Sequence, residues 1–222
     1  MKETRSQIPE GGEKVELERL VQLAGIGAAR AAEAFAQLVG REIRSEVPVV
    51  ARSAAVSATL GSPTETIPAS ASRDAAVAAQ GAAPAEAELS SSARTWSTGV
   101  FFEFEGCLDA IVGILFPAPS SEALVRRIVG IESGELVAPL IESALMEVGN
   151  ILASHVASGI ADAMGQRLLP SIPSLAMVDA EESLAAWVEE RVGRDAPSVE
   201  VAFRDEACEL EGRLVLVPTH AS

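Results

Sequence analysis

The chain contains an internal repeat, and this repeat restricts the possible folds more than any other feature of the sequence. Residues 20–50 align with residues 145–175 at a constant offset of 125 and without a gap. In both segments a long helical pattern stops at a glycine, Gly40 or Gly165, and an extended run then reaches a proline. A glycine directly after a helix is typical of a C-terminal cap. Two copies of one helix-and-strand unit predict an α/β protein with pseudo-twofold symmetry.

A second pair of matching segments has the pattern of β-hairpins. Residues 97–117 align with residues 198–218 at an offset of 101, which pairs Cys107 with Cys208. Each segment shows two β-type runs around a turn rich in Gly, Asp or Glu. The two cysteines are expected to be small buried residues at equivalent positions. Because one hairpin cannot bury both of its faces, we expect the two copies to form one fused domain.

The two offsets differ by 125 − 101 = 24 residues, and this excess falls in a segment rich in Ala, Ser and Pro. Such a segment buries too little apolar surface to offset an ordering entropy of roughly 1–2 kcal/mol per residue. A flexible surface insertion is therefore expected there. The predicted organisation is a flexible tail over 1–14 and a single domain over 15–222, with repeat 1 at about 15–130, the insertion at about 52–94 and repeat 2 at about 131–222.

Two shorter helices are expected outside the repeated long helix. One begins near Ser120 and Ser121, either of which has the side chain of a helix N-cap. The other covers residues 181–192, the place in repeat 2 that the insertion takes in repeat 1. Together with the hairpins, these helices predict a mixed fold of the α+β type.

Composition and charge exclude several classes of function. The net charge of −15 argues against nucleic acid and anionic lipid as partners, and favours a basic protein surface. No uncharged apolar run reaches the roughly 20 residues that span a bilayer, so membrane insertion is not expected. Two cysteines and two distant histidines supply neither a disulfide framework nor a metal site. A reducing cytoplasm is the expected location.

The long helix of repeat 2 has a polar face opposite its apolar stripe. Advancing each residue by about 100° separates the two sets on the helical wheel. The apolar set is Ile141, Leu145, Val148, Leu152 and Val156, and the polar set is Ser143, Glu147, Asn150 and Ser154. Most such faces are merely solvated. Here Gly149 and Asn150 both oppose the helix preference, and Gly149 permits a close approach, so the face is a candidate functional site.

These polar residues carry a resemblance to a known family. Ser143-x₃-Glu147-x₂-Asn150, followed by Pro173, resembles the [Asp/Ser]-x₃-Glu-x₂-Asn-x₂₂-Pro motif of the CheC/CheX/FliY phosphatases of chemotaxis. The two-copy organisation also resembles CheC. The similarity covers most of the chain outside the N-terminal tail and the insertion.

The resemblance implies a fold, an activity and partners. The fold is a pseudo-twofold central antiparallel sheet flanked by the two long motif helices. The activity is hydrolysis of the aspartyl phosphate of a CheY-type response regulator, with Glu147 and Asn150 as catalytic residues and Ser143 and Pro173 in supporting positions. The protein needs no cofactor of its own, since the Mg²⁺ is expected on the regulator. A CheD-like protein is a second candidate partner.

The first repeat departs from the motif. The offset of 125 maps Ser143, Glu147, Asn150 and Pro173 onto Glu18, Gln22, Gly25 and Pro48. Because Gly25 has no side chain that could hold a water molecule, we expect one working site in the second half and a degenerate one in the first. The alternative is a non-catalytic adaptor that binds a response regulator in a complex of the chemotaxis or flagellar-switch type.

Overall fold

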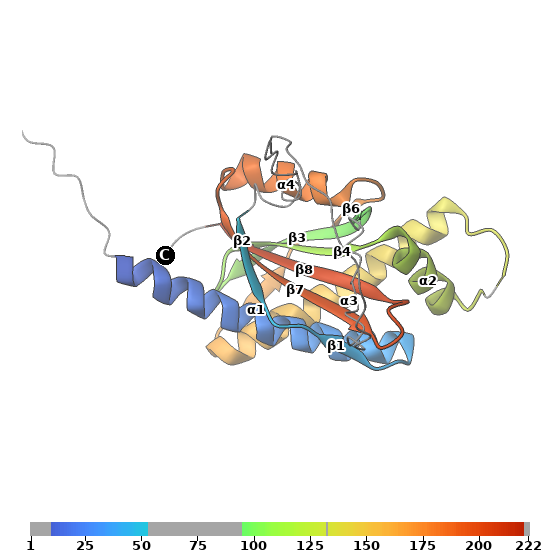
Figure 1. The fold of residues 1–222 in the computed structure, drawn as a ribbon, viewed down its shortest axis with the longest axis horizontal. Helices are drawn as coiled ribbons and strands as arrows, with labels where there is room; N and C mark the ends of the chain where they lie inside the picture. Colours follow the sequence, from blue (N-terminus) through green and yellow to red (C-terminus); the bar gives the residue numbers. More distant parts are fainter. Residues whose placement is uncertain (1–9, 53–94, 132, 220–222) are drawn as a thin grey trace, which may run out of the picture.

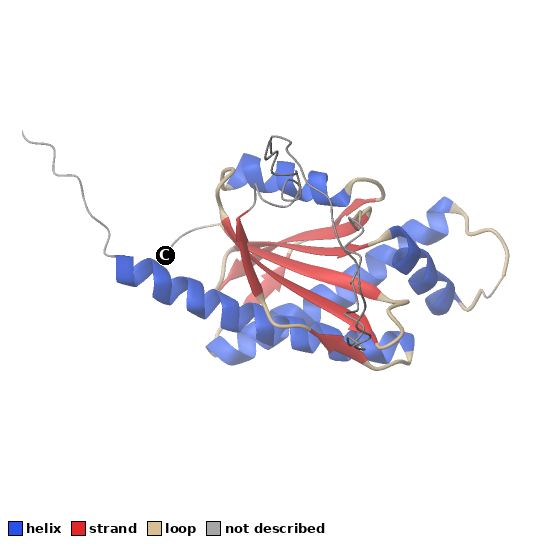
Figure 2. Ribbon diagram, viewed as in Figure 1, coloured by secondary structure: helices blue, strands red, loops and turns tan. Residues whose placement is uncertain are grey.

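The computed structural model describes residues 10–52, 95–131 and 133–219 of the chain, and Figure 1 shows the arrangement of their helices and strands. The helices are α1 (Glu10–Val39), α2 (Ala118–Val129), α3 (Ala138–Met164) and α4 (Ala180–Arg191). The strands are β1 (Ile43–Ser45), β2 (Val49–Arg52), β3 (Thr98–Gly106), β4 (Ala110–Phe116), β5 (Leu168–Pro170), β6 (Ser174–Ala176), β7 (Pro197–Asp205) and β8 (Glu211–Pro218). One sheet lies between α4 on one face and the long helices α1 and α3 on the other (Figure 2).

The sheet interlocks the two repeats. Its strand order is β1-β7-β8-β4-β3-β5, with β2 also paired to β7 and β6 also paired to β3, and all of these pairs are antiparallel. The short strands that follow α1 therefore pair with the hairpin of repeat 2, and those that follow α3 pair with the hairpin of repeat 1. The hairpins meet at the β4–β8 pair in the centre. The predicted fold class, a pseudo-twofold antiparallel sheet flanked by two long helices, is confirmed.

The hairpin alignment at an offset of 101 matches β3 with β7 correctly. For the second strand of each hairpin, β4 and β8, the same offset is wrong by one residue. Leu115 of β4 packs beneath α4, whereas Leu216 of β8 packs in the main core on the opposite face of the sheet. The turn of the β7–β8 hairpin spans 206–209 and is closed by a hydrogen bond from the N–H of Asp205 to the carbonyl oxygen of Leu210. It is one residue shorter than the turn of the β3–β4 hairpin, which spans 105–109. Because neighbouring strand residues face opposite ways, this single residue exchanges the two faces.

Two hydrophobic cores hold the layers together. The main core lies between the sheet and the helices α1 and α3, where the rings of Phe35, Phe116 and Phe203 lie with their centroids 5.5–6.2 Å apart. Centroid separations of this size are favourable for aromatic pairs. The smaller core lies beneath α4 and includes Phe101 and Leu184. The sheet is therefore covered on both faces, and the motif helix belongs to the main core.

The helix ends confirm one prediction and correct another. Gly40 and Gly165 follow α1 and α3 with φ of +64° and +63°, the left-handed conformation expected of C-terminal caps. The N-cap of α2 is Pro117, with no side-chain cap bond, so the assignment to Ser120 or Ser121 is wrong. Ser120 lies inside the helix and is buried, and its Oγ bonds instead to the backbone of the β7–β8 hairpin.

The structure also bears on the predicted N-terminal tail, the predicted insertion and the two cysteines. Helix α1 begins at Glu10 and so includes residues 10–14 of the predicted tail, while 1–9 lie outside the described residues. The predicted insertion at 52–94 also lies outside them, except for Arg52 at the end of β2. Cys107 is half-buried, but Cys208 is exposed in a turn at φ +54°, which corrects its predicted burial.

Candidate functional site

The predicted polar face forms on α3 as the helical wheel requires. Leu145, Val148, Leu152 and Val156 are buried and Ile141 is partly buried, while Ser143, Glu147 and Ser154 are exposed and Asn150 is half-buried. Residues three or four apart on a helix have their Cβ atoms about 5–6 Å apart. The carboxylate of Glu147 and the carboxamide of Asn150 are thus neighbours on one accessible face. Neither has a hydrogen-bond or ion-pair partner among the described residues.

The charge of α3 is of one sign. Glu142, Glu147 and Asp162 are its charged side chains, and the helix contains no lysine or arginine. A surface of this kind attracts a cationic group on a partner and repels an anionic one. The exposed Glu147 can therefore form a charge-assisted contact with a lysine brought to it, since the described part of the protein offers it none.

Gly149 has a structural role inside the molecule. A Cβ built on Gly149 would lie 2.6 Å from Cγ1, 2.8 Å from Cβ and 2.9 Å from Cγ2 of Val100 in β3. The close approach that this glycine permits is therefore between α3 and the sheet and not between α3 and a partner. This corrects the interpretation of Gly149 as a mark of the site. The contact holds the helix against β3 directly beside Asn150.

Pro173 lies in the loop that connects β5 and β6, and both strands pair with β3. In the equivalent loop of the first repeat, Cγ of Pro48 would lie 3.2 Å from a Cβ on Gly25. The pseudo-twofold relation maps that contact onto Pro173 and Asn150. The spacing of the motif thus has a structural reason, because the proline lies between two short strands that both pair with β3.

The first repeat keeps this scaffold without the polar pair. Glu18 and Gln22 are exposed on α1, and Gly25 is half-buried against Pro48. A side chain at residue 25 would require Pro48 to move by a few tenths of an ångström, because 3.2 Å is shorter than an ordinary carbon–carbon contact. Residues Glu18, Gln22, Gly25 and Pro48 therefore form a face of the same shape with different chemistry.

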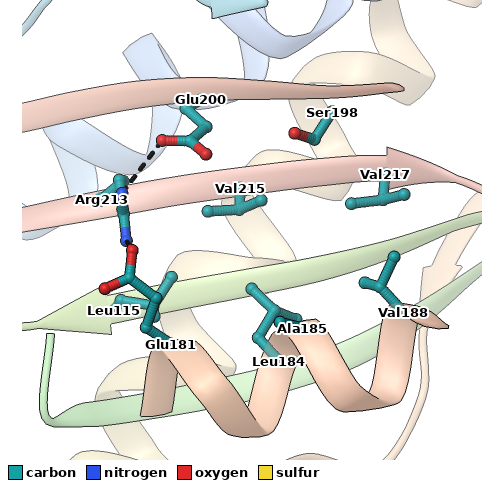
Figure 3. Close-up of a pocket in the computed structure, with 10 residues that line it drawn as sticks. All are labelled: Leu115, Glu181, Leu184, Ala185, Val188, Ser198, Glu200, Arg213, Val215 and Val217. Carbon is teal, nitrogen blue, oxygen red and sulfur yellow. Dashed lines mark hydrogen bonds and ion pairs between the residues drawn. The ribbon is translucent and has the colours of Figure 1, made fainter. Parts of the chain in front are cut away.

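A pocket lies beneath α4, on the face of the sheet opposite to the motif helix (Figure 3). Figure 3 shows Arg213 of β8 between Glu181 of α4 and Glu200 of β7, with N–O distances of 2.5 and 3.1 Å. The guanidinium carbon also lies 4.4 Å from the ring centroid of Trp96. The rest of the lining is mainly aliphatic. Since two carboxylates pair with this one arginine, the cluster clamps α4 to the sheet and offers no unpaired cation to an anionic ligand.

A second ion-pair cluster joins the end of α1 to the β7–β8 turn. Asp205 is buried and accepts hydrogen bonds from the backbone N–H groups of Glu209 and Leu210 and from Arg41 at 2.7 Å. Burial raises the pKa of Asp205, but the Leu210 N–H, the Arg41 guanidinium and the Glu209 N–H outweigh burial and hold this pKa below its ordinary value of 3.8. The cluster stabilises the fold and lies away from the motif face.

The described ranges carry neither a cluster of metal-binding side chains nor a membrane-spanning helix. These residues contain no group of three or more His, Cys, Asp or Glu side chains placed to hold a metal ion. No helix among them has the length and hydropathy needed to cross a bilayer. The exposed face of α3 remains the arrangement best suited to act on a partner.

Comparison with known proteins gives matches to one family. The model of the CheC-like family matches residues 140–176, which run from the start of the motif helix to just beyond Pro173. The CheY-P phosphatase CheC of Bacillus subtilis (strain 168) is 27% identical over 220 residues, covering 96% of this chain and 92% of that protein. The sequence match therefore extends well beyond the motif helix.

Solved structures share the fold at low sequence identity. FliY of Thermotoga maritima superposes with a TM-score of 0.55 and 12% identity, covering 96% of this chain and 91% of that chain. The chemotaxis protein CheX of Desulfovibrio desulfuricans gives a TM-score of 0.54, 12% identity and coverage of 88% and 98%. A chain of the CheX–CheY–BeF₃–Mg²⁺ complex of Borrelia burgdorferi superposes with a TM-score of 0.51 and 11% identity, covering 89% of this chain and 97% of that chain. Together the sequence matches and the shared fold support the resemblance of the chain to the CheC/CheX/FliY family of chemotaxis proteins.

Proposed function

We propose that the protein is a CheC-like phosphatase that hydrolyses the aspartyl phosphate of a CheY-type response regulator, using one active site in its second half. The observation that carries this proposal is the pairing of an exposed carboxylate, Glu147, with the neighbouring carboxamide of Asn150 on an outward face of α3. A helix with such a face can enter a partner's active site.

The chemistry asks little of the protein beyond positioning. An acyl phosphate is an activated mixed anhydride, so catalysis consists mainly of holding a water molecule in line with the leaving carboxylate. The carboxamide of Asn150 has both a donor and an acceptor and can orient that water molecule. Glu147 pairs with a lysine at the regulator's active site and anchors the complex. Ser143 and Pro173 support the helix and its surroundings.

The names of two similar proteins support this proposal. The Bacillus subtilis relative is a CheY-P phosphatase, and the Borrelia burgdorferi structure contains CheX together with CheY, BeF₃ and Mg²⁺. By analogy, the Mg²⁺ of the reaction belongs to the regulator, and this protein contributes Glu147 and Asn150. A cytoplasmic location and a CheD-like second partner are parts of the same proposal.

The degenerate face of the first half is proposed to be catalytically silent. Gln22 replaces the carboxylate by a neutral side chain, and Gly25 offers nothing that could orient water. The contact between Gly25 and Pro48 further opposes any substitute side chain there. One regulator is thus dephosphorylated at a time, on α3.

The decisive experiment measures phosphate release from a CheY-type regulator of the same organism, phosphorylated with acetyl phosphate. Asn150→Ala is expected to lower kcat by roughly a hundredfold, because water is no longer held in line. Glu147→Gln is expected to weaken docking and raise KM. Ser154→Ala lies one turn further along the same exposed face and should leave both constants unchanged.

Two results would contradict the proposal. If Asn150→Ala released phosphate as fast as the parent, the catalytic role of this face would be wrong. If the parent bound the phosphorylated regulator without accelerating hydrolysis, the protein would be an adaptor, which is the other function that the family allows. Circular dichroism of each variant checks that α3 is intact.

A further inference from the structure

The two most exposed large apolar side chains of the described residues occupy equivalent positions in the two repeats. Ile172 is 89% exposed and Val47 is 81% exposed, and they are separated by the repeat offset, since 47 + 125 = 172. Each directly precedes the proline of its motif loop, Pro173 or Pro48. The repeat places an exposed apolar side chain at the same point of both loops, so the two copies differ in the helix face that accompanies the loop, and only α3 carries the polar pair.

The loop that carries Ile172 is held in place by hydrogen bonds. The backbone N–H of Ser171 donates to the carbonyl oxygen of Glu103 in β3 at 2.7 Å, and the N–H of Glu103 donates to Oγ of Ser171 at 2.9 Å. On the other side, Pro173 fixes one backbone dihedral before β6 rejoins β3. Ile172 is therefore presented to solvent by a braced loop, and a partner would lose little loop entropy on contacting it.

The repeat relation indicates that this loop lies next to the proposed catalytic face. In the first repeat, Pro48 lies against Gly25 at 3.2 Å from the place of a Cβ. The repeat offset maps this contact onto Pro173 and Asn150, so we expect Ile172 to lie one residue from a neighbour of the proposed water-holding side chain. A protein that presses its active site onto this face of α3 would then also contact this loop.

We propose that Ile172 is an apolar docking contact for the response regulator, and that it contributes to binding and not to the chemical step. This inference rests on the proposed function, which supplies the partner and its position on α3. The regulator is chosen over a second copy of this chain because of charge. Helix α3 carries Glu142, Glu147 and Asp162 and no lysine or arginine, so two copies of this helix brought together would repel each other, whereas a site built around a lysine and a metal ion would be attracted.

The division of labour follows from the chemistry of the two groups. Glu147 and Asn150 act on the phosphorylation site itself, where contacts become stronger as the reaction proceeds. An aliphatic side chain at the rim gains free energy only by leaving water, and gains the same amount in the ground state and the transition state. Removing it should therefore raise KM and leave kcat unchanged.

The test compares Ile172→Ser with Val47→Ser in phosphate release from the phosphorylated CheY-type regulator. Ile172→Ser is expected to raise KM roughly five- to thirtyfold, with kcat within about twofold of the parent. Ile172→Leu should restore most of the affinity. Val47→Ser makes the same kind of change at the equivalent loop of the silent half and should leave KM unchanged. An unchanged KM for Ile172→Ser, or an equal rise for Val47→Ser, would overturn the inference.

A binding measurement separates this inference from the proposed function. Calorimetry with the same regulator, held in its active form by beryllofluoride and Mg²⁺, reports docking without hydrolysis. Ile172→Ser should weaken this binding by the same factor as it raises KM. If Asn150→Ala proved fully active while Ile172→Ser still weakened binding, the catalytic assignment would fail and the docking contact would stand. If Asn150→Ala abolished hydrolysis and Ile172→Ser bound like the parent, the docking contact alone would be wrong.

Discussion

Gly149 connects the packing of the fold to the geometry of the site, and its replacement by alanine tests both. The new Cβ would lie 2.6–2.9 Å from three carbon atoms of Val100, where ordinary contacts are 3.5–4.0 Å. Overpacking of this severity costs about 3 kcal/mol, and the better helix propensity of alanine returns about 1 kcal/mol. The net loss of about 2 kcal/mol should lower Tm by roughly 4–8 °C in a chain of this size.

The same substitution should affect the reaction. To relieve the collision, α3 must move away from β3, and Asn150 moves with it. Because a displacement of about 1 Å can cost a hundredfold in rate, a smaller shift should lower kcat roughly tenfold. Thermal unfolding followed by circular dichroism measures the first effect, and phosphate release at saturating regulator measures the second.

Two controls make the argument specific. Gly159→Ala changes a second buried glycine of α3, but its nearest neighbour is Cγ of the exposed Arg30, which can rotate away, so a smaller loss of stability is expected. Val100→Ala removes the carbons at 2.6 and 2.9 Å and leaves the one at 2.8 Å, so Gly149→Ala should cost about 1 kcal/mol less in that background. A Gly149→Ala protein as stable as the parent, or a cost independent of Val100, would refute the reasoning.

Two further predictions concern stability and the silent half. Asp205→Asn should lower the free energy of unfolding by about 2 kcal/mol at neutral pH, because the ion pair with Arg41 and the charge-assisted bonds to the turn are weakened. The pKa of Asp205 is lower in the folded protein than in the unfolded chain, so its contribution to stability is complete above the unfolded pKa and is lost as pH falls through the folded pKa. The Tm difference between parent and variant should therefore shrink below pH 3.8. A Tm difference that stays constant with pH would contradict this. Gln22→Ala and Gly25→Ala should leave the rate of phosphate release nearly unchanged, and a large loss in either would mean that the first half is active.

The local features of the sequence predicted the helices and the candidate face well. The stripe of α3 follows from a period of 3.6 residues, and its glycine stop follows from the left-handed backbone that Gly165 adopts. Both depend on residues within a few positions of one another. The exposure of Glu147 could be predicted for the same reason, since the opposite side of an amphipathic helix faces solvent.

The hairpins show where such reasoning reaches its limit. A match of residue types placed Leu115 and Leu216 at equivalent positions, yet they lie on opposite faces of the sheet. The deciding factor is a turn that is one residue shorter, and residue types alone do not reveal where such a deletion falls. The prediction of the α2 N-cap was wrong for a related reason, because the hydroxyl of Ser120 forms hydrogen bonds with the backbone of a hairpin about 90 residues away.

The sequence by itself determined the repeat, the long helices with their glycine ends, and the polar face with Glu147 and Asn150, because each arises from short-range periodicity or from direct comparison of two segments. Only the tertiary structure decided that the short strands of each repeat pair with the hairpin of the other. It also decided that Gly149 packs on Val100 and that Ile172 is exposed to solvent. These features depend on contacts between residues distant in the chain, whose free energies are set by the assembled sheet.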